Sequence, residues 1–131
     1  MGTRAIFTFT DQHESCHVFQ HWDGYPSGAH DTLRTWIDSG LSWPFPRFEV
    51  DESAAGFIAA NKTEPGGYRI AKSRTQYCDV EYGYTIKANN SGDITLVVSA
   101  TDFWDGKRKE SKLWSGPLAD YTKDLARQIE G

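Results

Sequence analysis

Two runs in the second half of the chain alternate between apolar and mostly polar residues, and this pattern constrains the fold more than any other feature. The first run covers residues 80–88 and the second covers 94–100, with a turn of Asn, Ser and Gly between them. A period of two is typical of strands that have one covered face and one wet face. The sequence therefore predicts a β-hairpin in this region.

A second hairpin is predicted near the start of the chain, from residues 4–10 and 16–22 with a turn at 11–15. In its first strand, Ala5, Phe7 and Phe9 share one face, while Ile6 and Thr8 share the other. In its second strand, the side chains fall on two faces, with Cys16, Val18, Gln20 and Trp22 on one and His17, Phe19 and His21 on the other. Residues 68–71 predict a further short strand beside the hairpin of residues 80–100.

Three helices are also predicted. The first carries an apolar stripe that is typical of an amphipathic helix, formed by Ala29, Leu33, Trp36 and Ile37, and it stops at Gly40. The second runs from Asp51 to about Asn61, and the third begins with Pro117 in its first turn. Residues 43–46 contain two prolines, so we expect an ordered connector there.

This order of elements predicts an α+β fold with a single antiparallel sheet of about four or five strands, containing two hairpins. About three helices are expected to pack mainly on one face of this sheet. Residues 1–131 are expected to form a single domain, since a chain of this length buries roughly two-thirds of its unfolded surface. No repeat or linker suggests a second domain.

Composition narrows the classes of function. Aromatic residues make up 14% of the chain, so we expect an aromatic core. A formal net charge of −4 argues against direct nucleic-acid binding, which needs a concentrated basic surface. No apolar stretch approaches the ~20 residues that span a bilayer, and no secretory signal is evident, so a cytoplasmic location is expected. In that compartment a disulfide between Cys16 and Cys78 is not favoured.

The segment His21-Trp-Asp-Gly-Tyr-Pro-Ser-Gly28 joins a predicted strand to a predicted helix, and such loops often carry function. Together with Met1-Gly-Thr-Arg4 and the hairpin between them, it resembles a group of small uncharacterised bacterial and phage proteins. Members of that group begin with Met-Gly-Thr-Arg and carry an aromatic-Asp-Gly-Tyr-Pro-Ser-Gly loop before a helix. The resemblance covers roughly the first third of the chain and implies a phage or bacterial context without implying an activity.

The candidate binding residues come from this loop and its surroundings. They combine aromatic rings that can stack on a partner with groups that can pair with charge, and they are His21, Trp22, Asp23, Tyr25, Arg4 and Trp104. Trp104 belongs to a second Trp-Asp-Gly sequence at 104–106, which is explained equally well by shared turn chemistry. Whether the two Trp-Asp-Gly loops meet is left open.

Metal binding and catalysis have weaker support. His17 and His21 share a strand face but lie ~13 Å apart, so one ion cannot bridge them, and we expect no metal and no cofactor. Cys16 and His17 are adjacent in a strand and point to opposite faces, which excludes a dyad. No catalytic residue is therefore assigned, although Asp23 with His21 would be the pair used if the chain were an enzyme.

Three functions follow, in order of preference. The first is a small non-catalytic binding protein of a phage or mobile element, for example an anti-CRISPR-like inhibitor of a host defence system, which occupies the surface of a host protein. The second is a protein that sequesters a nucleotide or another small ligand, with an arginine holding phosphate. The third is a small hydrolase or transferase that uses Asp23 and His21. Self-association into a homo-oligomer is left open.

Overall fold

The structure, a computed structural model, describes the backbone of residues 2–104 and 107–131 and the side chains of residues 2–102 and 108–131. Its elements follow one another in the order β1 (Ala5–Thr10), β2 (Ser15–Gln20), α1 (Pro26–Ser39), α2 (Val50–Asn61), β3 (Tyr68–Ala71), β4 (Tyr82–Ala88), β5 (Ile94–Trp104), β6 (Lys107–Pro117), the 3-10 helix η1 (Leu118–Asp120) and α3 (Lys123–Glu130). The chain is therefore of the α+β class, as predicted.

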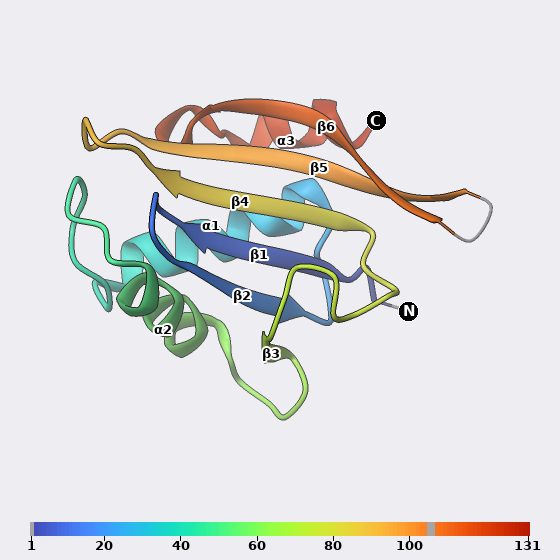
Figure 1. Cartoon of the computed structure of the whole chain (residues 1–131), viewed down its shortest axis with the longest axis horizontal. Helices are drawn as coiled ribbons and strands as arrows, with labels where there is room; N and C mark the ends of the chain where they lie inside the picture. The colour runs from blue at the N-terminus through green and yellow to red at the C-terminus, as the bar shows by residue number, and fades with distance from the viewer. Residues whose placement is uncertain (1, 105–106) are drawn as a thin grey trace.

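All of these strands form one six-stranded sheet in the order β3-β2-β1-β4-β5-β6 (Figure 1). Neighbouring strands are antiparallel except β1 and β4, which run parallel with Phe7 opposite Tyr84. The prediction of an antiparallel sheet with four or five strands is thus wrong. Parallel neighbours need a long crossover, and here α1, α2 and β3 lie between β1 and β4 in the chain and provide it.

The strand that the sequence did not predict is β6, an edge strand that pairs with β5. Its segment contains four lysines and arginines and shows no apolar alternation, and charged residues of this kind protect sheet edges from pairing with other molecules. The register of the pairing between β5 and β6 also shifts between Val98 and Ser99 of β5. The alternation of side chains along β6 is therefore broken at this point. Pro117, which was expected to begin the last helix, instead ends β6.

Several predicted element ends also move. β3 pairs with β2, with Tyr68 opposite Gln20, and not with the hairpin formed by β4 and β5. α1 begins at Pro26 because proline fits the first turn of a helix. α3 begins at Lys123, where the Thr122 hydroxyl accepts a hydrogen bond from Leu125 N at 3.2 Å. As predicted, Gly40 ends α1 in a left-handed conformation with φ 70°.

The helices pack on the face of the sheet that carries Phe7, and in Figure 1 α1 and α3 lie behind it. The Phe7 ring stacks on Tyr84 at 4.9 Å and lies 4.8 Å from the Phe57 ring of α2. Trp36 of α1 meets Phe9 edge to face at 5.4 Å. This aromatic contact between helices and sheet forms the main core. No helix in the described part of the chain combines the length and apolar composition needed to cross a bilayer.

The opposite face of the sheet is covered by the segment that connects β3 to β4, which crosses in front of the sheet in Figure 1. Val80 of this segment packs with Ile6 and Phe19, and the Tyr77 ring stacks on Phe19 at 4.1 Å. β1 is therefore buried from both sides, which explains why the second face of its strand is apolar at Ile6.

A polar network fixes the same segment to the sheet. Arg74 Nη1 donates to the Thr8 hydroxyl at 2.7 Å, and its Nε and Nη2 donate to the Glu110 carboxylate of β6 at 2.8 to 3.1 Å. The Thr8 hydroxyl also lies 2.9 Å from Nδ1 of His17. Burial, together with the Arg74 charge, lowers the pKa of His17, so this histidine favours its neutral form here.

The two cysteines are free and lie on different faces of the sheet. Cys16 packs against the helix-side core, and burial raises the pKa of its thiol. Cys78 is exposed in the segment that crosses the opposite face.

Replacing Phe57 with Ala should lower the free energy of unfolding by about 3 to 5 kcal/mol, because the ring is fully buried between the sheet and α1. Urea denaturation of the two proteins measures this difference. Ile70→Ala is the control, since Ile70 is 76% exposed on β3 and should change stability by no more than about 0.5 kcal/mol. Equal losses in the two variants would contradict the assignment of the core.

Glu110→Gln should destabilise the protein at neutral pH by about 1 kcal/mol, since it removes a partly exposed bidentate ion pair. The hydrogen bonds from Arg74 hold the pKa of Glu110 below its usual 4.5. The pair therefore adds stability above the unfolded pKa, and this stability is lost as the pH falls through the folded pKa. Urea midpoints measured from pH 7 down to acid should fall less steeply in Glu110→Gln than in the parent.

The matched control for that measurement is Glu14→Gln, which removes an exposed carboxylate from the turn between β1 and β2. The urea midpoint of Glu14→Gln should equal that of the parent protein at each pH. A Glu110→Gln curve parallel to the parent's would show that the Arg74 pair does not contribute to acid sensitivity.

Candidate functional site

The segment formed by residues 22–28, here called the anchored loop, follows β2, continues into the first turn of α1 and is held by other parts of the chain. Gly24 N donates to the Thr3 carbonyl at 2.8 Å, just before β1. The Gly24 carbonyl accepts a hydrogen bond of 2.7 Å from the buried Tyr84 hydroxyl of β4. Burial raises the pKa of Tyr84 well above its ordinary value, so the phenol remains a donor. The first half of the loop is thus fixed to the centre of the sheet.

The second half of the loop is fixed by the C-terminal segment. Ser27 donates from its backbone N and its hydroxyl to Oε1 of Glu130, at 2.9 and 2.7 Å. The Tyr121 hydroxyl donates to the Pro26 carbonyl at 2.9 Å. A carboxylate at this position satisfies a free amide and complements the dipole of α1, whose N-cap residue Tyr25 makes no side-chain cap of its own.

Backbone geometry explains the order of small and polar residues in the loop. Asp23 has φ 60°, a left-handed conformation that Asp tolerates better than most residues. A Cβ at Gly24 would lie 2.6 Å from the Ala5 Cβ, and one at Gly28 would lie 2.1 Å from the Asp23 carbonyl oxygen. Both glycines therefore permit close approach of the loop to β1 and to itself. The positive φ of the turn belongs to Asp23.

An open polar hollow of about 460 Å³ lies beside the anchored loop, and we call it the polar hollow. Its lining comes from the loop, from the end of β2, from α1 and from the segment around β3, and it includes Trp22, Asp23, Tyr25, Gln20, Asp31, Thr32, Asn61, Glu64 and Tyr68. The segment around β3 is held in place by a hydrogen bond from His21 N to the Gly67 carbonyl at 2.9 Å. Trp22 and Tyr25 remain 40% and 36% exposed.

The charges of the polar hollow are all negative. Asp23, Asp31 and Glu64 contribute carboxylates, and no Lys or Arg is among the described lining residues. Asp31 is paired with Lys123 at 2.5 Å, and this hydrogen bond lowers its pKa. Within the described residues, neither Asp23 nor Glu64 forms an ion pair. The Asp23 charge raises the pKa of Tyr25.

The structure brings together three of the six candidate binding residues and places two others, Arg4 and His21, on the opposite face of the sheet. Trp22, Asp23 and Tyr25 line the polar hollow. Arg4 pairs through Nε with Asp79 at 2.8 Å, in the segment that covers the opposite face of the sheet. The His21 ring lies on that face too, 6.0 Å from Phe19, although its edge also meets Trp22.

The parity of the strands causes this separation, because neighbouring residues of a strand point to opposite faces. The Trp104 side chain lies outside the described residues, as do Asp105 and Gly106 of the second Trp-Asp-Gly sequence. The question of whether the two loops meet thus concerns residues outside the described part of the chain.

Sequence reasoning missed most lining residues of the polar hollow, among them Gln20, Glu64 and Tyr68. Gln20 carried a signal, since it is a polar residue on the strand face that also holds Val18, and it is 2% exposed. Glu64 and Tyr68 carried none, because they reach the hollow only through the pairing of β3 with β2. A buried polar residue at the end of a strand was thus the one available clue.

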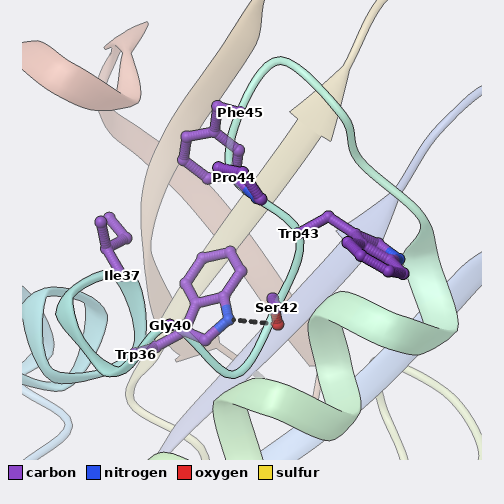
Figure 2. Close-up of a pocket in the computed structure, with 7 residues that line it drawn as sticks. All are labelled: Trp36, Ile37, Gly40, Ser42, Trp43, Pro44 and Phe45. Atoms are coloured by element: carbon purple, nitrogen blue, oxygen red, sulfur yellow. Dashed lines mark hydrogen bonds between the residues drawn. The ribbon is translucent and has the colours of Figure 1, made fainter.

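A second hollow, of about 230 Å³ and mostly apolar, lies between α1 and the connector that follows it (Figure 2). Trp36 and Ile37 line it from α1, and Trp43, Pro44 and Phe45 line it from the connector. Trp36 Nε1 donates to the Ser42 hydroxyl at 2.9 Å, which fixes the connector against the helix. None of the candidate binding residues with a described side chain lines this apolar hollow.

The chemistry of the described residues offers little to a reaction. No group of three His, Cys, Asp or Glu side chains there is placed to hold a metal ion. No hydrogen bond joins His21 to Asp23 within those residues, although a general base needs such contact with its partner or substrate.

The chain matches no protein-family model, no curated protein and no solved structure. The similarity of residues 1–4 and 21–28 to the bacterial and phage group stays a prediction. Function is therefore inferred from the anchored loop and the polar hollow.

Asp23→Asn should lower the pKa of Tyr25 toward the ordinary value for tyrosine, because the carboxylate charge is the largest cause of its rise. Asn tolerates the same left-handed backbone, so the loop should keep its conformation. Titration of the Tyr25 ring by NMR, assigned with Tyr25→Phe, measures the shift. An unchanged pKa in Asp23→Asn would contradict the proximity of the two side chains.

Proposed function

We propose that this chain is a small non-catalytic binding protein whose anchored loop and polar hollow dock on the surface of a partner protein. The observation that carries the proposal is the loop itself, which presents Trp22 and Tyr25 at the rim of the hollow on a backbone fixed from several sides. Aromatic residues of this kind are enriched among the side chains that dominate binding energy.

The fixed backbone supports binding for an energetic reason. Ordering a flexible loop on association costs roughly 1 kcal/mol for each immobilised side chain, in addition to the backbone cost. Gly24 and Ser27 already make the hydrogen bonds that hold this loop in the free protein. A partner would therefore find the aromatic rim pre-organised, and little of the contact energy would be lost to ordering.

The nature of the partner follows from the resemblance to bacterial and phage proteins. We propose a host protein as the partner, and a phage or mobile element as the origin of the chain, with inhibition of a host defence system as the biological outcome. Among the alternatives, a nucleotide is not favoured, because the hollow has carboxylates at its wall and Arg4 pairs with Asp79 elsewhere. Catalysis by Asp23 and His21 lacks a contact between them.

The tagged protein, incubated with a bacterial lysate, should retain a partner that Trp22→Ala and Tyr25→Ala each release. We expect each variant to weaken the complex at least about tenfold, since truncating a central aromatic residue commonly costs 2 kcal/mol or more. Mass spectrometry identifies the retained protein, and titration of the purified partner measures the affinity.

Trp43→Ala is the matched control, because Trp43 is 45% exposed but belongs to the apolar hollow. It should leave the complex intact. Loss of the partner in Trp43→Ala alone would show that the interface lies at the apolar hollow. Recovery of no protein besides the tagged chain would contradict a host partner in that lysate.

A further inference from the structure

We infer that the polar hollow receives the cationic end of a Lys or Arg side chain from the partner. This inference rests on the proposed function, since it names the chemistry that the same surface recognises. It is carried by the hydrogen-bonding groups, the charges and the aromatic rings that line the hollow.

Gln20 supplies the first argument. It is almost completely buried at 2% exposure, and its amide nitrogen donates to the Trp22 carbonyl at 2.5 Å. That carbonyl fixes the orientation of the amide, because a reversed amide would place two acceptor oxygens together. Its Oε1 is buried and has no partner among the described residues. A buried acceptor without a donor is costly, and Gln20 lines the hollow, so this residue favours a ligand that brings N–H groups.

Asn61 shows the same polarity. Its amide nitrogen donates to the carbonyls of Thr32 and Phe57, at 3.2 and 3.0 Å. Both acceptors are backbone oxygens, so the orientation of this amide is fixed as well. The amide nitrogens of Gln20 and Asn61 are thus used inside the protein, and oxygen atoms are left for the hollow.

The charges in the wall of the hollow favour a cation, as do its hydrogen-bond acceptors. Asp23 and Glu64 lie in the wall of the hollow and form no ion pair with any described residue, whereas Asp31 is already paired with Lys123. Lys62, the nearest lysine in the chain to Glu64, donates through Nζ to the Tyr68 carbonyl at 2.9 Å. Two carboxylates are therefore available to a cation.

The aromatic side chains complete the site. Trp22, Tyr25 and Tyr68 line the same hollow, and the face of such a ring attracts an ammonium or guanidinium group. Burial raises the pKa of Tyr68, so its ring remains a neutral phenol. The volume of about 460 Å³ accommodates a side chain that extends its methylene groups along the rings and its charge toward Glu64.

The probe is N-acetyl-lysine amide, and its matched neutral analogue is N-acetyl-norleucine amide, which has a similar aliphatic side chain without the ammonium group. Titration of the purified protein, followed by amide NMR shifts, should show saturable shifts at Trp22 and Tyr68 with the lysine compound. We expect the norleucine compound to bind at least about tenfold more weakly, since a charge-assisted contact contributes about 1.5 kcal/mol or more.

Glu64→Gln should weaken the lysine compound about threefold to fivefold, which is the effect of losing one exposed charge pair. Asp120→Asn is the control, since it removes an exposed carboxylate of η1, outside the lining of the hollow. It should leave the affinity unchanged, whereas added salt should weaken the interaction in all forms of the protein.

Equal binding of the lysine and norleucine compounds, or equal binding to the parent and Glu64→Gln, would overturn the inference. If spermidine binds more than about tenfold tighter than a peptide of several lysines, the hollow is a site for a free polyamine. That result would overturn the inference that the hollow receives a side chain of the partner. The proposed function would survive either result if Trp22→Ala still released the partner protein.

Discussion

The pairing of β1 with β4 is the contact on which the rest of the structure depends. β1 lies inside the sheet, with β2 on one side and β4 on the other, and both of its faces are buried. The parallel alignment brings the residues before β1 next to the start of β4, and Gly24 is held there between the Thr3 carbonyl and the Tyr84 hydroxyl. The position of the anchored loop therefore follows from the topology of the sheet.

The class of fold could be predicted from the sequence because its strongest patterns are local. Phe7 and Phe9 alternate in β1, and Trp36 belongs to the apolar stripe of α1. Each pattern depends only on which face of a single element is buried. The parallel contact and β6 could not be predicted in the same way. The parallel contact depends on how the β1–β2 hairpin and the β4–β5 hairpin meet. The strand β6 is a charged edge strand that is held by its pairing with β5.

The candidate site also has a part that local sequence predicts and a part that it does not. Trp22, Asp23 and Tyr25 are consecutive or nearly so, and the chain turn that joins them is encoded by neighbouring glycines and proline, so they were predicted together. His21 was separated from them by the parity of a strand, and Arg4 by its partner Asp79. Glu64 and Tyr68 enter through strand pairing, which links distant residues without a local pattern. Binding sites built across elements are predictable in part for this reason.

The central claim is that the anchored loop is rigid before any partner binds. Backbone ¹⁵N relaxation of the free protein tests it most directly, because order parameters separate fixed from mobile amides on the nanosecond timescale. We predict values of about 0.85 for the amides of residues 22–25, 27 and 28, equal to those of β1 and α1. Values below about 0.6 in that loop, beside rigid strands, would contradict a pre-organised binding surface.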